Sequence, residues 1–177
     1  IVAYSLDNSI FNFSVMISLI AFIIYNVMTG KIFLGDFGAY SLSALVAFKS
    51  LEFYANGNVS VFFLAALLVY PCFELARSLL LRLVRNTSIM SPDNNHLHNY
   101  INEYIINFDI SKHISNSFTG IGIAVTTSGI PVLIYFFGSS IQSNIWQIIF
   151  AIQLLSLSLI YMFFEKKSRE NTNHCYN

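Results

Sequence analysis

The sequence predicts an all-α membrane protein, a polytopic helix bundle with about five transmembrane helices and a cytoplasmic amphipathic helix. Hydrophobic residues make up 55% of the 177 positions and charged residues only 10%, whereas a soluble globular domain carries about 25% charged residues. So few charges cannot cover a surface that faces water. The apolar residues are gathered in continuous stretches, each near the roughly 20 residues that a helix needs to cross the bilayer core. These stretches lack the alternation typical of strands in a transmembrane barrel.

Five apolar stretches define the predicted spans. Because backbone polar groups in lipid must be satisfied within the segment, each stretch is expected to be helical. Gly129 and Pro131 are expected to kink the fourth span. In the second span, Lys49 and Glu52 lie three residues apart near the outer end, and we interpret them as a structural ion pair. The predicted spans cover residues 10–28, 38–54, 60–81, 118–137 and 144–164.

The distribution of Lys and Arg predicts the orientation. Segments 1–9, 55–59 and 138–143 contain no Lys or Arg. The positive-inside rule therefore places these segments outside and the alternate connections in the cytoplasm. The N-terminus is expected outside, and any chemistry is expected on the cytoplasmic face. The cytoplasmic loops 29–37 and 82–115 and the tail 165–177 contain Lys31, Arg82, Arg85, Lys112, Lys166, Lys167 and Arg169.

Composition also limits the partners. The net charge is zero, which gives no electrostatic footprint for nucleic acid. Cys72 and Cys175 lie far apart and form no disulfide framework. The chain opens on Ile1 and shows no signal peptide, so we expect the N-terminal part of a longer protein to precede it.

The first candidate for chemistry is Asp36, which lies between Gly35 and Gly38 at the cytoplasmic end of the second span. Glycine allows a ligand to approach the backbone closely. A carboxylate at this place could hold Mg²⁺, which binds through one or two carboxylates together with substrate phosphates. The alternative is that Asp36 is the N-cap of the second span.

The second candidate is the long cytoplasmic loop with His96 and His98. An amphipathic interfacial helix is expected to follow, with Asp93 as its start signal. Histidines two residues apart do not face each other on a helix. If both act on one ligand, the local backbone must be extended or turning. The alternative is two solvated loop histidines, and a zinc site lacks a third ligand nearby. The apolar positions of the helix are Leu97, Ile101, Tyr104, Ile105 and Phe108.

The third candidate is the polar end of the third span, where Glu74, Arg77, Arg82 and Arg85 share one sector of the helix. Arginine's planar fork suits phosphate oxygens, so these residues could form a basic wall for a diphosphate. Glu74 and Arg77 could instead pair with each other. Arg82 and Arg85 could be topogenic charges only.

Three segments together resemble one family, the membrane-embedded sugar-1-phosphate transferases that act on polyprenyl phosphates (the glycosyltransferase 4 family). Residues 32–40, IFLGDFGAY, resemble its F-[ML]-G-D-x-G loop. Residues 70–74, YPCFE, followed by Arg82, resemble its next helix toward the cytoplasm. Residues 91–99, SPDNNHLHN, resemble its SPxxPDxxHxHH loop with one to two positions altered. The order and spacing of the segments match, and the first two resemble the surface-polysaccharide branch.

The resemblance implies a reaction and a role for each candidate. A lipid phosphate attacks the β-phosphorus of a UDP-N-acetylhexosamine, UMP leaves, and a polyprenyl-diphosphate sugar forms. Asp36 would be a Mg²⁺ ligand, His96 and His98 would contact the nucleotide-sugar diphosphate, Arg82 would hold phosphate, and Asp93 would order the histidine loop. The acceptor would be undecaprenyl phosphate in the bacterial cytoplasmic membrane, at the start of surface-polysaccharide synthesis. A homodimer is left open.

The match also has departures. Asn99 replaces a histidine of the fullest motif, and Asn94 lies near a position that is often basic. The family's paired aspartates would lie upstream of Ile1, so residues 1–177 are expected to be the C-terminal part of one transmembrane transferase domain. Alone, they are expected to release no UMP from UDP-N-acetylhexosamine. The alternative function is a non-catalytic membrane protein, either a transporter piece or a degenerate lipid-phosphate binder. A transporter would place its ionisable residues near the bilayer midplane.

Overall fold

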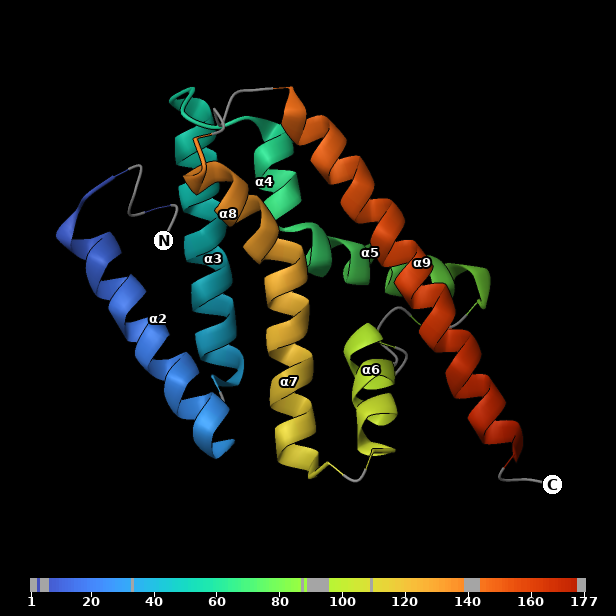
Figure 1. The fold of residues 1–177 in the computed structure, drawn as a ribbon. Helices are drawn as coiled ribbons and strands as arrows, with labels where there is room; N and C mark the ends of the chain where they lie inside the picture. The colour runs from blue at the N-terminus through green and yellow to red at the C-terminus, as the bar shows by residue number, and fades with distance from the viewer. Residues whose placement is uncertain are drawn as a thin grey trace.

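The computed structural model describes residues 3, 7–32, 34–86, 88, 96–108, 110–138 and 144–174, with side chains of the last segment described up to Lys167. Within these ranges the chain contains helices and no strand, which confirms the all-α fold (Figure 1). The helices are α2 (Ile10–Thr29), α3 (Gly35–Ala55), α4 (Val61–Leu67), α5 (Val69–Val84), α6 (Leu97–Ile106), α7 (Lys112–Ala124), the π-helical turn η1 (Val125–Gly129), α8 (Ile130–Phe136) and α9 (Ile145–His174).

The number of membrane spans is smaller than predicted. By length and composition, three helical segments of the described chain could cross a membrane: α2, the continuous run Lys112–Phe136, and Ile145–Lys167. The pair α4 and α5 makes a fourth if a 77° bend is allowed within one span. By length and composition, the described residues thus give fewer than the five spans predicted. The second predicted span forms the 21-residue helix α3, which does not belong to this set.

Lys49 and Glu52 form the ion pair expected from the sequence. The Lys49 ammonium lies 2.9 Å from Glu52 and 3.6 Å from Asp7, a residue of the chain before α2. The pair therefore also joins the last turns of α3 to the chain that precedes α2.

Pro71 explains the bend between α4 and α5. Proline has no N–H, and its ring clashes with the carbonyl four residues earlier, which here is that of Leu67. The helix breaks at Leu68. In an apolar surrounding the freed carbonyl needs another donor, and the Ser128 hydroxyl of η1 donates to the Leu67 carbonyl at 2.8 Å. A residue 61 positions away thus completes the bend.

Pro131 likewise frees a backbone carbonyl in the fourth predicted span, where the sequence predicts a kink. The carbonyl four residues before it belongs to Thr127, and α7 passes into α8 through the π-helical turn η1. The Gln153 side chain of α9 donates to the Thr127 carbonyl at 2.7 Å. The turn is therefore bound to α9 as well as to the α4–α5 bend.

Removal of either donor is expected to destabilise the protein. Ser128→Ala and Gln153→Ala each leave a proline-freed carbonyl without a donor. We expect each to lower the free energy of unfolding by about 1 kcal/mol. This value lies between the roughly 0.6 kcal/mol average for a side-chain hydrogen bond inside a membrane and the roughly 1–3 kcal/mol cost of a buried unsatisfied group. Ser158→Ala is the matched control, because the Ser158 hydroxyl donates to Leu154 within an uninterrupted helix. The measurement is reversible unfolding in detergent. Equal stability of all three variants would contradict this account.

Two apolar clusters join several of the described helices. In one, between α4 and α9, the Phe63 and Trp146 rings pack edge to face with their centroids 4.6 Å apart. In the other, Val69, Leu97 and Leu157 join α5, α6 and α9. The second cluster fixes α6 beside the polar end of α5. α6 is therefore the amphipathic helix expected from the sequence, with Leu97 only 2% exposed.

The ends of α2, α3, α7, α8 and α9 group as the charge pattern predicts, whereas α5, with Arg82 in its last turn, lies across the middle of the bundle (Figure 1). α2 ends and α7 begins at one end of the bundle, where α9 also ends (low in Figure 1). α3 and α8 end at the opposite end. Lys31 follows α2 and Lys112 begins α7, so these cations belong to the first group.

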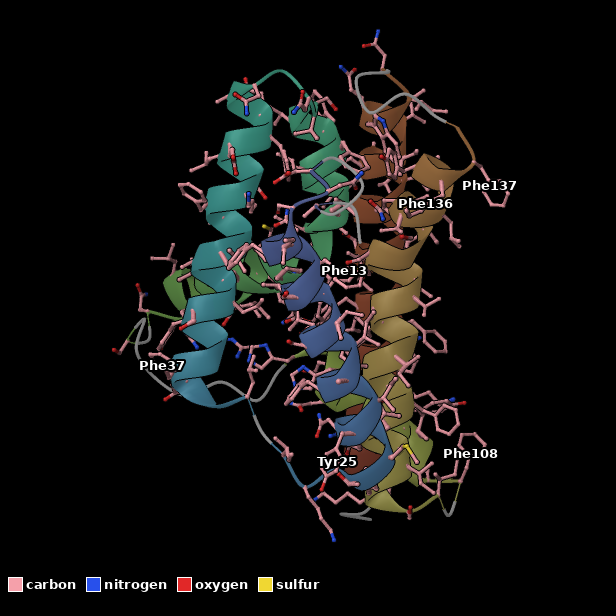
Figure 2. The ribbon with its side chains drawn as sticks, turned by 90° about the vertical axis from the view of Figure 1, so that its left-hand side faces the viewer. Phe13, Tyr25, Phe37, Phe108, Phe136 and Phe137 are labelled. Atoms are coloured by element: carbon pink, nitrogen blue, oxygen red, sulfur yellow. The ribbon has the colours of Figure 1, made fainter. Side chains whose placement is uncertain are left out.

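The bundle carries apolar side chains on its outer surface, as a protein in contact with lipid requires. Figure 2 shows rings that point away from the helices, and they are those of Phe13, Tyr25, Phe37, Phe108, Phe136 and Phe137.

Candidate active site

The Glu74 carboxylate of α5 lies at the start of α6 and binds it at two points. Oε1 accepts the backbone N–H of Leu97 at 2.8 Å, and Oε2 lies 3.0 Å from Nδ1 of His96. The Glu74 side chain is only 12% exposed. Glu74 therefore supplies the cap of α6 from another helix, and it positions the histidine loop.

His96 and His98 lie side by side with their rings stacked. The ring centroids are 5.6 Å apart and the ring planes differ by 8°. His96 is the N-cap residue of α6, with extended backbone at φ −92° and ψ 148°, and His98 lies in the first turn. Sequence reasoning required extended or turning backbone if both histidines serve one ligand, and the structure has it. The two imidazoles present one continuous polar edge.

The environment of His98 lowers its pKa below the ordinary 6.5, chiefly because burial disfavours the charged form. The neighbouring His96 lowers the pKa further, and the charge of Glu74 opposes both effects. His98 is therefore neutral at pH 7. Its contribution to stability is fully present above pH 6.5 and is lost as the pH falls, since the unfolded chain then binds the proton more readily.

We expect an NMR titration to show this pKa below 6.5. His96→Ala should raise the pKa of His98 toward 6.5, and Glu74→Gln should lower it further, because the two neighbours act in opposite directions. A pKa of His98 at or above 6.5 in the unsubstituted protein would contradict the arrangement.

Arg77 is directed away from the histidine loop. Its Nη2 lies 3.2 Å from Oε2 of Glu165, and its guanidinium lies over the Tyr161 ring at 3.5 Å, both on α9. The sequence also allowed Glu74 and Arg77 to pair with each other. In the structure Glu74 instead binds α6 and Arg77 binds α9. Both interactions are tertiary, so spacing along one helix could not reveal them.

Arg82 and Arg85 lie where α5 ends. Arg82 is half-buried in the last turn, and Arg85 is the exposed C-cap residue. They follow Glu74 by two and three helical turns, so the basic side chains lie further along the same helix that binds the histidine loop.

Asp36 is exposed in the first turn of α3, directly after Gly35 at φ +67°. This positive φ explains the need for glycine at position 35. The N-cap residue of α3 is Leu34, and no side chain caps the helix. The alternative that Asp36 is the N-cap is therefore wrong. Within the described part of the chain, no hydrogen bond or ion pair joins Asp36 to His96 or His98.

A magnesium ion would find one carboxylate at the start of α3. The described residues hold no group of three or more His, Cys, Asp or Glu that could bind a metal ion, and Glu74 is occupied by α6. An exposed lone carboxylate still suits Mg²⁺, which takes most of its ligands from water and substrate phosphates. Asp93 lies outside the described residues. Its expected role as the start signal of the helix is wrong, because α6 begins at Leu97 with His96 as the N-cap residue.

Together these features define a class: a multi-pass helical membrane protein with imidazole and guanidinium groups on adjoining helices. Residues 1–54 match the family described as glycosyl transferase family 4. The undecaprenyl-phosphate alpha-N-acetylglucosaminyl 1-phosphate transferase of Thermotoga maritima is 31% identical over 94 residues. These residues are 52% of this chain and 31% of that relative's length. No solved structure matches. Both matches agree with the family that the motifs resemble, over the part of the chain that they cover.

Proposed function

We propose that the protein transfers N-acetylhexosamine-1-phosphate from a UDP-sugar to undecaprenyl phosphate and releases UMP. The observation that carries the proposal is the fixed histidine pair, because Glu74 binds both His96 and the first amide of α6. Paired imidazoles at the start of α6, together with the guanidinium of Arg82 two turns beyond Glu74 on α5, are groups that suit a diphosphate ligand. The family match and the name of the relative support the same chemistry.

The reaction balances without a covalent enzyme intermediate. An oxygen of the lipid phosphate forms a bond to the β-phosphorus of the UDP-sugar. The bond from that phosphorus to the bridging oxygen breaks, and UMP leaves with the electron pair. Such transfers depend mainly on positioning and on neutralising charge.

Each candidate residue then has a role that fits its place. His96 and His98 contact the diphosphate of the donor, and Arg82 with Arg85 forms the basic wall along the end of α5. Asp36 would hold Mg²⁺, and Asp93 would order the histidine loop. Mg²⁺ held there would supply positive charge to neutralise the phosphates.

The test is release of UMP by purified protein in lipid with Mg²⁺. We expect UMP only when UDP-N-acetylhexosamine and undecaprenyl phosphate are both present, and the lipid-linked sugar should appear in equal amount. The assay uses the full-length protein that the gene encodes. UMP release that does not need the lipid would indicate a hydrolase. Lipid binding with no UMP in a folded sample would favour the non-catalytic alternative.

The charge pattern predicts that the histidine loop faces the cytoplasm of a bacterial inner membrane. We expect an impermeant thiol reagent to label a cysteine at Asn58 in intact cells, but not one in α6. Asn102 accepts a 2.6 Å hydrogen bond from Ser115, so the exposed neighbour Glu103 is the better reporter position. Cys72 is exposed and has to be replaced first. Labelling at position 103 but not at position 58 would show that the topology is the reverse of the one predicted.

A further inference from the structure

The segment of α9 from Tyr161 to Lys167 packs against both α5 and α6, the helices that carry the histidine pair and its cap (Figure 1). The Arg77 guanidinium of α5 lies 3.5 Å from the centroid of the Tyr161 ring, and its Nη2 lies 3.2 Å from Oε2 of Glu165. Tyr161 is only 3% exposed. The sequence predicts only the end of a membrane span here, whereas the contacts show that the segment anchors α5.

The same segment holds α6 through aromatic rings. The rings of Tyr100 and Tyr161 pack edge to face with their centroids 5.8 Å apart. One turn further along α6, the Tyr104 ring packs against Phe164 at 5.6 Å, and the Lys167 ammonium lies 4.4 Å from the Tyr104 centroid. Aromatic pairs prefer this geometry to face-to-face stacking. Two contacts one turn apart fix α6 both along α9 and in its rotation about its own axis.

The three helices are therefore joined in pairs. Glu74 joins α5 to α6, because it binds His96 and the Leu97 amide. Tyr161 takes part in both of the other joints, with Arg77 of α5 and with Tyr100 of α6. No one of the three helices can then turn or slide without breaking one of these contacts. The imidazoles at the start of α6 take their place from this closed set.

An ion pair in this set serves positioning better than it serves stability. The Arg77 and Glu165 side chains are only 17% and 27% exposed. Taking charges out of water is costly, and apolar side chains of similar volume often stabilise a protein as well or better. The planar guanidinium, however, has to lie over the Tyr161 ring and meet Glu165 in one orientation. It therefore defines the rotation of α5 against α9.

We propose that Tyr161 is a positioning residue for the transfer reaction. It fixes α6 relative to α5 and so sets the place of His96 and His98 against the donor diphosphate. The inference rests on the proposed function, since it names a residue on which the rate of that reaction depends. Tyr161 acts through Tyr100 of α6 and through Arg77 of α5, and it takes no part in the chemistry itself.

Replacement of Tyr161 by Leu tests the inference, because it removes the ring that both helices contact. We expect kcat for UMP release to fall at least about tenfold, since a misplacement of about 1 Å can cost a hundredfold in rate. Tyr161→Phe keeps the ring and should retain kcat within a few-fold. Phe63→Leu is the matched control, because it makes the same kind of truncation at a site 0% exposed in the other apolar cluster. It should leave kcat within a few-fold.

Two readouts follow α6 without any turnover. Hydrogen exchange at Tyr100 and Tyr104 should rise in Tyr161→Leu. The pKa of His98 in an NMR titration should rise toward 6.5, because desolvation is the main cause that lowers it. Phe63→Leu should change neither readout. Tyr100→Leu removes the same contact from the side of α6, so the double variant with Tyr161→Leu should lose no more kcat than the worse single one. Where Tyr161→Leu does not fold, Tyr100→Leu alone provides the test.

Unchanged exchange and an unchanged pKa of His98 in Tyr161→Leu would overturn the inference. So would equal losses of kcat in Phe63→Leu, or full turnover in a variant whose α6 has loosened. Absence of UMP release from the folded, unsubstituted protein would refute the transfer reaction. In that case the exchange and the pKa still decide whether Tyr161 positions the histidines, so the two proposals fail separately.

Discussion

Replacement of Asp36 by Asn is expected to abolish Mg²⁺-dependent release of UMP and to leave the protein folded. Asp36 is exposed in the first turn of α3 and makes no capping hydrogen bond, so its removal breaks no packing. Loss of a residue that only supports a metal ligand typically reduces metal affinity or activity 10–100-fold. Loss of the ligand itself should therefore reduce turnover by at least about a hundredfold. The measurement is UMP release across a Mg²⁺ titration.

Asp7→Asn is the matched control for this substitution. Asp7 is also an aspartate, and it lies 3.6 Å from Lys49 near the opposite end of α3, so its loss should leave turnover within a few-fold. A purely structural Asp36 would behave differently. Its favourable position near the helix N-terminus is worth about 0.3–1 kcal/mol of stability. Near-normal turnover with a small loss of stability would assign Asp36 to that structural role.

Much of the fold follows from properties that the sequence states directly. The small number of charges and the long apolar runs predict helices that lie in lipid. The positions of Leu97 and Ile101 predict the buried face of α6. The bend between α4 and α5 was missed, although Pro71 is visible in the sequence. Proline in a membrane helix is tolerated when another group binds the freed carbonyl. That group is Ser128, which only the tertiary structure identifies.

The candidate site shows the same limit. Sequence motifs singled out His96 and His98, and their i, i+2 spacing correctly required non-helical backbone at one of them. Glu74 lies within the quoted motif YPCFE, yet its spacing suggested a pair with Arg77. Its real partners are 22 and 23 residues away. A buried carboxylate at the end of a span was the available signal, because such a group needs a partner.

Replacement of Glu74 by Ala is expected to disable the histidine pair without unfolding the bundle. The Leu97 amide and His96 Nδ1 would both lose their acceptor, and each buried unsatisfied group costs about 1–3 kcal/mol. The start of α6 should then open, while Tyr100 and Ile101 still hold the rest of the helix against its cluster. Because a misplacement of about 1 Å can cost a hundredfold in rate, turnover should fall about a hundredfold.

Two further variants make this prediction specific. Glu74→Gln keeps a carbonyl oxygen for the Leu97 amide, so it should retain more turnover than Glu74→Ala and should shift the pH profile, since the charge beside His98 is gone. Glu103→Gln removes an exposed carboxylate from the same helix and should leave turnover within a few-fold. Hydrogen exchange at the first turn of α6 gives the structural readout, and it should rise in Glu74→Ala alone. Full turnover in Glu74→Ala, or equal losses in the Glu103 control, would show that the cap on α6 does not position the histidines for the reaction.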